Sequence, residues 1–222
     1  MSLAALEKKI GHRFHDSSLL QSALTHSSSG QRSNYERLEF LGDRVLGLII
    51  AQALFQKFPE ENEGDLAKRL AALVQGSMLA TIASAIQLGD HILLSDAEKS
   101  AGGAANENIL ADVFEAMLGA LYLDGGFAAC ERLVTTLWAD HFYDMKTPPL
   151  HPKTAVQEWA QAKGLPLPLY EVVAQHGPDH APVFVIRLTV AGHAPVQAEG
   201  RSRQAAEKEA AAQFLTTIGH AV

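Results

Sequence analysis

Acidic side chains recur at helical spacing on one side of a strongly apolar stretch. Glu36, Glu39 and Asp43 follow one another at intervals of three and four residues, and the segment from Leu38 to Phe55 is apolar nearly all round. Intervals of three and four place side chains on the same side of a helix. We therefore expect a buried helix that carries three carboxylates on one side.

A second apolar segment repeats this arrangement. Between Ile109 and Leu123 the charged residues are Asp112 and Glu115, three positions apart. Burying an isolated carboxylate is costly, so such groups are normally paired with a cation or bound to a metal. Two such helices packed face to face would join Asp112 and Glu115 to Glu39 and Asp43 in an all-oxygen site suited to Mg²⁺, with Mn²⁺ as a substitute.

Axial distances assign the acids to different places. Glu39 and Asp43 lie ~6 Å apart on a helix that rises ~1.5 Å per residue, whereas Glu36 lies ~10.5 Å from Asp43. We therefore place Glu36 at the edge of the site. Arg37 and Arg44 each follow an acid by one position, roughly 100° around the helix, so we expect them to point away from the acids. Arginines from elsewhere in the chain stay open as an alternative to a metal.

Two other polar clusters have simpler interpretations. The acidic stretch Glu60–Asp65 follows Pro59 and is read as a solvated loop whose last acids stand at the start of the next helix, where negative charge is stabilised. His12 and His15 have a spacing found in metal sites, but their surroundings favour a role in a loop or a helix cap.

Composition limits the class of protein. A hydrophobic share of 47% and a charged share of 19% are typical of a folded soluble chain. A single cysteine, Cys130, excludes an intrachain disulfide and a cysteine zinc cluster and fits a reducing compartment. No apolar run reaches the ~18 residues of a membrane span, and the N-terminus has no signal-peptide pattern. We expect a cytoplasmic protein that does not enter the membrane.

Charge is distributed unevenly along the chain. Residues 1–150 contain 12 Lys/Arg and 19 Asp/Glu, a balance of −7, and residues 151–222 contain 6 of each, a balance of zero. Contact with nucleic-acid phosphates depends on Lys and Arg. Net charge therefore argues mildly against nucleic-acid binding, and any such role must rest on local placement of cations.

A proline-rich stretch divides the chain. Residues 146–152 contain Pro148, Pro149 and Pro152, which favour a stiff extended linker. Helical spacing of apolar residues before it predicts an all-helical domain over 1–145. Residues 153–222 predict a small α-β-β-β-α domain, and the fold class is α+β.

The predicted elements of the smaller domain follow its apolar pattern. A helix is expected over Lys153–Lys163, and strands are expected over Tyr170–Ala174, Val183–Val190 and Val196–Glu199. Phe184, Ile186, Leu188 and Val190 share one face of the second strand, and Ala206, Ala210, Phe214 and Ile218 mark a closing helix.

The stretch Asn34–Asp43 resembles the signature helix of bacterial ribonuclease III, the nuclease that cuts double-stranded RNA. Ala23–Ser27, Glu63–Asp65 and Ile109–Ala116 resemble further motifs of that family, and 153–222 resembles its double-stranded-RNA-binding domain. The resemblance extends over the whole chain in the same order. A non-catalytic RNA-binding relative on this scaffold would have lost some of the acids, and all of them are present.

The resemblance implies a function and a site. Glu39, Asp43, Asp112 and Glu115 match the Mg²⁺-binding acids, with Asp43 and Glu115 central to catalysis, while Glu36 and Glu63 match acids that border the catalytic valley and contact RNA or the partner subunit. It implies a homodimer with one cutting centre per subunit and no small-molecule cofactor. The products would carry 5′-phosphate and 3′-hydroxyl ends with a short 3′ overhang, in processing of ribosomal RNA precursors and mRNA.

The resemblance also implies RNA-binding residues in the smaller domain. Hydroxyl, amide and carboxylate groups suit RNA 2′-hydroxyls, and a helix N-terminus suits phosphate. The matched residues are Thr154, Gln157 and Glu158 on the first helix, His180 in a loop, and Ser202, Arg203 and Lys208 at the start of the last helix. Adjacent basic residues usually follow the serine, but Arg203 is followed by Gln204, so we expect weak, salt-sensitive binding.

Overall fold

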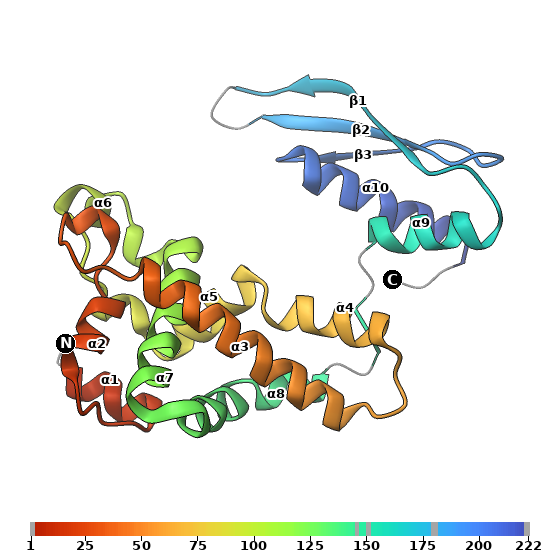
Figure 1. Cartoon of the computed structure of the whole chain (residues 1–222). Coiled ribbons are helices and arrows are strands. Elements are labelled where there is room, and N and C mark those ends of the chain that lie inside the picture. The colour runs from red at the N-terminus through yellow and green to blue at the C-terminus, as the bar shows by residue number, and fades with distance from the viewer. Residues whose placement is uncertain (1–2, 145–146, 150–151, 179–181, 220–222) are drawn as a thin grey trace. The chain divides into compact units, whose positions relative to one another are not determined.

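The computed structural model describes the chain except residues 1–2, 145–146, 150–151, 179–181 and 220–222. It forms two compact units, Met1–Pro148 and Pro149–Val222, each with its own hydrophobic core (Figure 1). Part of the expected linker, residues 146, 150 and 151, lies outside the described residues.

The first unit is helical, as predicted. Its helices are α1 (Leu3–Ile10), α2 (Ser17–Ala23), α3 (Glu36–Lys57), α4 (Glu63–Leu73), α5 (Gly76–Ala85), α6 (Asp96–Ser100), α7 (Glu107–Leu137) and α8 (Ala139–Asp144), joined in places by short 3₁₀ turns. Asp16, Asn62, Ser95 and Asn106 cap four of these helices through side-chain oxygens that accept backbone N–H groups.

Helix α7 is the centre of this unit. Its buried side chains include Val113, Phe114, Met117, Leu118 and Leu121, which are fully shielded from solvent. By length and composition α7 could span a membrane, but more than half of its most apolar window is buried within the unit, as in a core helix. The backbone leaves helical geometry at Gly126, where φ is 73° and ψ is −179°, so α7 consists of two segments joined at a break.

Helix α3 packs along α7 but is not buried all round, so that prediction is wrong. Leu46, Ile49 and Ile50 face the core, whereas Phe40 and Phe55 are 70% and 72% exposed. An apolar sequence does not reveal which of its faces a partner within the same chain covers. One side of α3 is therefore an exposed apolar surface.

The second unit confirms the predicted α-β-β-β-α order. Helix α9 (Pro152–Ala162) precedes the strands β1 (Leu169–His176), β2 (Val183–Thr189) and β3 (Val196–Gly200), and α10 (Arg203–Thr217) closes the unit. The strands form an antiparallel sheet in the order β1-β2-β3, and both helices lie on one of its faces (Figure 1).

The core of the second unit lies between this sheet and its helices. Ile186 and Leu188 of β2 point into it, as the alternation predicts, and meet Val156 of α9 and Phe214 of α10.

Candidate metal centre and nucleic-acid surface

Two glycines let α3 and α7 approach closely at the level of the acids. A Cβ atom at Gly42 would overlap the backbone carbonyl of Glu115, and a Cβ at Gly119 would overlap that of Leu38. Only glycine permits backbone-to-backbone contact of this kind. The crossing therefore holds the acidic residues of the two helices opposite one another.

The structure brings three of the predicted metal ligands together. Each of Glu39, Asp112 and Glu115 offers a carboxylate oxygen, and these oxygens all lie within 4.8 Å of one another. All three side chains are half-buried. Asp43 is not in this trio, although its charge acts on both Glu39 and Glu115.

Electrostatics at the trio are unfavourable for ionised carboxylates. Burial, with the charges of Asp43, Glu39 and Asp112, raises the pKa of Glu115 to about 8. Burial and neighbouring acids also raise the pKa of Glu39, and burial raises that of Asp112. Carboxylates packed at this density either retain protons or share a cation.

A divalent cation fits this donor set. Carboxylate oxygens are hard ligands of the kind that Mg²⁺ and Mn²⁺ prefer. Among the described residues, the charge that favours ionised Glu115 is that of Arg44, and its effect is the smallest of those acting on the group. Arginine pairing, the alternative to a metal, therefore does not balance the trio.

Arg44 does not point away from the acids, so that prediction is wrong. Its Nη2 lies 3.3 Å from Asp43 Oδ2 in an ion pair whose side chains are 73% and 42% exposed. A long, flexible side chain can fold back along the helix to reach the carboxylate beside it. Asp43 is thus the more solvent-exposed acid, held by its sequence neighbour.

Glu36, predicted at the edge of the site, is exposed, and its charge acts on Glu39. Its carboxylate accepts a hydrogen bond from Asn34 Nδ2 at 3.1 Å, and its backbone N–H donates to Asn34 Oδ1 at 3.2 Å. Because Asn34 holds both groups at the start of α3, the Glu36 carboxylate has a defined position.

Sequence reasoning missed an aromatic pair beside Asp112. The Tyr35 hydroxyl donates to Asp112 Oδ2 over a long 3.5 Å, and the Tyr35 ring stacks on His26 with centroids 5.3 Å apart. His26 also caps a 3₁₀ turn by accepting the Ser28 N–H. Tyr35 and Asp112 are 77 positions apart, so only the fold reveals their contact.

Glu63 is exposed on the first turn of α4, after the Asn62 cap. The acidic stretch before it is not simply a solvated loop, because Glu61 pairs with the buried Arg69 through Nε at 2.7 Å and Nη2 at 2.5 Å. The Arg69 guanidinium also lies 3.8 Å over the Phe58 ring. This pair fixes the loop from which α4 starts.

The exposed Phe40 is one of the residues that line a groove. Its volume is about 1040 Å³, and it is lined by α2, the segment before α3, the first turns of α3 and Leu123 of α7. Leu123 is 54% exposed. The groove and Phe40 together form a largely apolar surface at one side of the helical unit.

In the second unit, Thr154, Gln157 and Glu158 are exposed on α9. Thr154 and Gln157 line a groove of about 420 Å³ that continues to Tyr170 on β1. Their side chains therefore face a surface that a polar ligand can enter.

The start of α10 carries the other predicted RNA-binding residues. Ser202 Oγ caps the helix by accepting the Ala205 N–H at 3.1 Å, and Lys208, six residues later, is exposed. Arg203 Nε donates to Glu207 Oε1 at 2.8 Å, so its charge is partly neutralised. His180 lies outside the described residues.

Lys153 was not predicted. Its Nζ pairs with Glu207 Oε2 at 2.5 Å. It lines the groove at α9 and also a groove of about 430 Å³ at the start of α10, which Ser202 and Lys208 line too. Burial would raise the pKa of Glu207, but Lys153 and Arg203 lower it below its ordinary value. Two cations on one buried carboxylate leave net positive charge at this helix start.

Comparisons with known proteins agree with this geometry. Residues 16–141 match the model of the Ribonuclease-III-like family, and residues 152–218 match that of the double-stranded RNA binding motif. A protein named Ribonuclease 3 from Ehrlichia ruminantium (strain Welgevonden) is 44% identical over 222 residues, which is 98% of each chain. One of the same name from Caulobacter vibrioides (strain NA1000 / CB15N) is 48% identical, over 96% of this chain and 95% of its own.

A solved structure has a similar helical unit. The nuclease domain of ribonuclease III from Campylobacter jejuni, described with structural flexibility in a region involved in dimer formation, is 43% identical to this chain. It superposes with a TM-score of 0.62, over 64% of this chain and 99% of its own.

Proposed function

This chain belongs to the ribonuclease III family, and we propose that it cuts double-stranded RNA with divalent ions held by Glu39, Asp43, Asp112 and Glu115. The observation that carries the assignment of these residues is the trio of carboxylates whose oxygens lie within 4.8 Å of one another across the α3–α7 crossing. Mg²⁺ is the proposed ion, with Mn²⁺ as a substitute.

Each acid has a distinct task in this proposal. Glu39, Asp112 and Glu115 face one another and would hold the ion, and Glu115, which retains a proton near neutral pH without it, would release that proton on binding. Asp43 is more exposed and is oriented by Arg44, so its carboxylate would complete the ion site from the solvent side, beside the attacking water. A bound divalent ion supplies charge stabilisation for the phosphoryl oxygens and a water activated for attack.

The reaction that follows is hydrolysis of the P–O3′ bond. Water adds hydroxide to phosphorus, which becomes the 5′-phosphate, and a proton goes to the leaving oxygen, which becomes the 3′-hydroxyl. Glu36 and Glu63 stand at exposed edges of the helical unit and would contact RNA or the partner subunit. No further cofactor enters this scheme.

A homodimer is part of the proposal. The strands of an RNA duplex are antiparallel, so cutting both requires two centres related by a two-fold axis. Phe40, 70% exposed beside a groove of about 1040 Å³, is a candidate for insertion into the same groove of a second copy. Phe40→Asp should yield monomers in size-exclusion chromatography with light scattering, whereas Phe55→Asp, equally exposed but outside the groove, should leave the dimer intact.

The second unit would hold the duplex. Thr154, Gln157 and Glu158 would meet 2′-hydroxyls, and the start of α10, with Ser202, Arg203 and Lys208, would meet phosphates. We extend this role to Lys153, which lines the groove at α9 and the groove at the start of α10. Precursors of ribosomal RNA and mRNA are the proposed substrates, in the cytoplasm and away from membranes.

A cleavage assay tests the proposal. Perfect duplex RNA is incubated with pure protein with Mg²⁺ and with a chelator, and cutting should require the metal. Glu115→Gln should abolish cutting and leave duplex binding nearly unchanged, whereas Glu131→Gln on the same helix, where Glu131 bonds to Gln52, should cut normally. Cutting in the chelator would overturn the metal mechanism, and equal loss of cutting and binding would assign Glu115 a structural role.

A further inference from the structure

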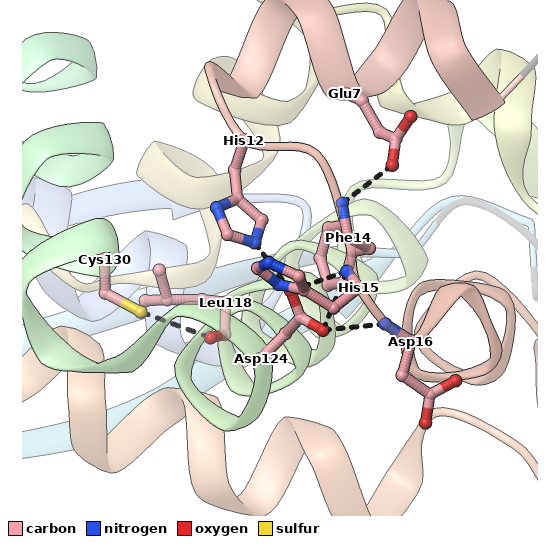
Figure 2. Close-up of polar contacts among 8 residues, drawn as sticks. All are labelled: Glu7, His12, Phe14, His15, Asp16, Leu118, Asp124 and Cys130. Atoms are coloured by element: carbon pink, nitrogen blue, oxygen red, sulfur yellow. Dashed lines mark hydrogen bonds and ion pairs between the residues drawn. The ribbon is translucent and has the colours of Figure 1, made fainter.

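A second cluster of metal-ligating side chains lies at the break in α7, apart from the four acids. Asp124 lies two residues before the break at Gly126, and its side chain is only 2% exposed. The loop between α1 and α2, which carries His12 and His15, passes directly over it (Figure 2).

Both histidine rings point at the same carboxylate oxygen. His12 Nε2 lies 2.7 Å and His15 Nδ1 lies 3.2 Å from Asp124 Oδ2 (Figure 2). The three ligand atoms lie within 4.8 Å of one another. Two imidazoles and one carboxylate therefore converge from segments more than a hundred positions apart in the chain.

The surrounding backbone holds this arrangement in place. Asp124 Oδ1 accepts the N–H groups of His15 at 3.1 Å and Asp16 at 2.9 Å, which orients the carboxylate. A Cβ at Gly125 would lie 2.7 Å from His12 Cε1, so the glycine makes room for the ring. The loop is also tied to α1, because Glu7 Oε1 accepts the Phe14 N–H at 2.9 Å.

Access from solvent is retained. The His12 side chain is 15% exposed and that of His15 is 85% exposed, so an ion can enter without unfolding the helical unit. The buried side of the cluster is closed by the Phe14 ring, which meets His12 edge-on at 5.1 Å. The cluster thus has a fixed floor and one open side.

We propose that His12 Nε2, His15 Nδ1 and Asp124 Oδ2 bind one transition-metal ion of the Zn²⁺ class. Two imidazoles and a carboxylate suit Zn²⁺ or Co²⁺, whereas the all-carboxylate trio between α3 and α7 suits Mg²⁺. In a tetrahedral Zn²⁺ site with bonds of roughly 2.0–2.1 Å, adjacent ligand atoms lie roughly 3.3 Å apart. The observed 3.2 Å matches this spacing, and the 2.7 Å hydrogen bond would lengthen as the ion replaces the ring proton.

The bound ion would join the N-terminal loop to the break in α7. Its fourth position would be taken by water from the open side. An ion that binds only the folded chain stabilises it in proportion to ligand concentration. The site is therefore assigned to stability of the helical unit, and the nuclease reaction does not depend on it.

The test uses untagged full-length protein in excess Mg²⁺, so that the carboxylate trio is occupied. Zn²⁺ is titrated by isothermal calorimetry, and Co²⁺ is used as an optical probe of four-coordinate geometry. Wild-type protein should bind one equivalent, and its helical unit should melt at a higher temperature with Zn²⁺. Loss of a residue that only hydrogen-bonds to a metal ligand weakens metal binding roughly 10–100-fold. His15→Ala removes a proposed ligand itself, so it should weaken Zn²⁺ binding by at least this factor.

Matched variants make the outcome decisive. His176→Ala removes another exposed histidine, in the second unit, and should bind Zn²⁺ as the wild type does. Glu115→Gln should also retain this site. The proposal would be overturned if His15→Ala bound Zn²⁺ as tightly as the wild type, if the wild type bound no Zn²⁺, or if only Glu115→Gln lost Zn²⁺ binding. The two histidines and Asp124 would then form only a hydrogen-bonded cluster.

Discussion

The raised pKa of Glu115 predicts an unusual pH dependence for the metal-free protein. In the folded chain this carboxyl retains its proton up to about pH 8, whereas in the unfolded chain it titrates near the ordinary value of 4.5. Between these values the folded state binds more protons, so the free energy of unfolding falls as pH rises. The contribution is fully present below about pH 4.5 and is lost as pH passes through about 8.

The size of this effect follows from the same difference. One pKa unit corresponds to about 1.4 kcal/mol, and after allowance for solvent screening at a half-buried group the expected loss is about 2–4 kcal/mol. Glu115→Gln has the same shape and no titrating group. In the presence of a chelator, the unfolding free energy of Glu115→Gln should therefore lack this pH dependence of about 2–4 kcal/mol. At about pH 9 the variant should have a larger unfolding free energy than the wild type.

Urea unfolding measures this difference. Trp138 is fully buried in the helical unit, and in a Trp159→Phe background its fluorescence reports that unit alone. Mg²⁺ should restore the unfolding free energy of the wild type at high pH and have little effect on that of Glu115→Gln. Glu131→Gln should follow the wild type throughout. Equal pH slopes for wild type and Glu115→Gln, or equal stabilisation of both by Mg²⁺, would refute the reasoning.

Three other substitutions probe the supporting structure. Gly42→Ala should destabilise the helical unit by about 1–3 kcal/mol, because its Cβ overlaps α7, and it should abolish cutting. Gly47→Ala, on the same helix, has open space around its Cβ and should increase the free energy of unfolding by about 0.5–1 kcal/mol, as measured by thermal or urea unfolding. Tyr35→Phe should raise the Mg²⁺ concentration for half-maximal cutting about tenfold, with unchanged rate at saturation. Lys153→Met should destabilise the second unit by about 1–3 kcal/mol and weaken duplex binding in filter assays, while Lys163→Met should do neither.

Much of the site could be predicted because helical spacing is a local property. Intervals of three and four residues place Glu39 on the same side as Asp43, and Asp112 on the same side as Glu115, whatever the rest of the chain does. Because buried carboxylates are normally paired with a cation, their place in two apolar helices predicts a cation site. The sequence pattern also predicts the strands and closing helix of the second unit, where alternation separates buried Ile186 from its half-buried neighbours.

The missed features depend on tertiary placement or on side-chain flexibility. The contact of Tyr35 with Asp112 and that of Lys153 with Glu207 join segments far apart in sequence. Arg44 bends back by rotation about side-chain bonds, which position on a helix does not determine. The exposed side of α3 was missed because the sequence pattern of an apolar helix is the same whether its faces pack against its own chain or against a second copy.

The close crossing of α3 and α7 at Gly42 and Gly119 makes the spacing of the acids independent of the core packing that sets thermal stability. Because α3 and α7 meet through main-chain atoms at Gly42 and Gly119, the spacing of their acids does not depend on how neighbouring core side chains fill space. Conservative repacking of the core, for example at Leu121, should then change the thermal stability of the helical unit while the spacing of the acids on α3 and α7 is preserved.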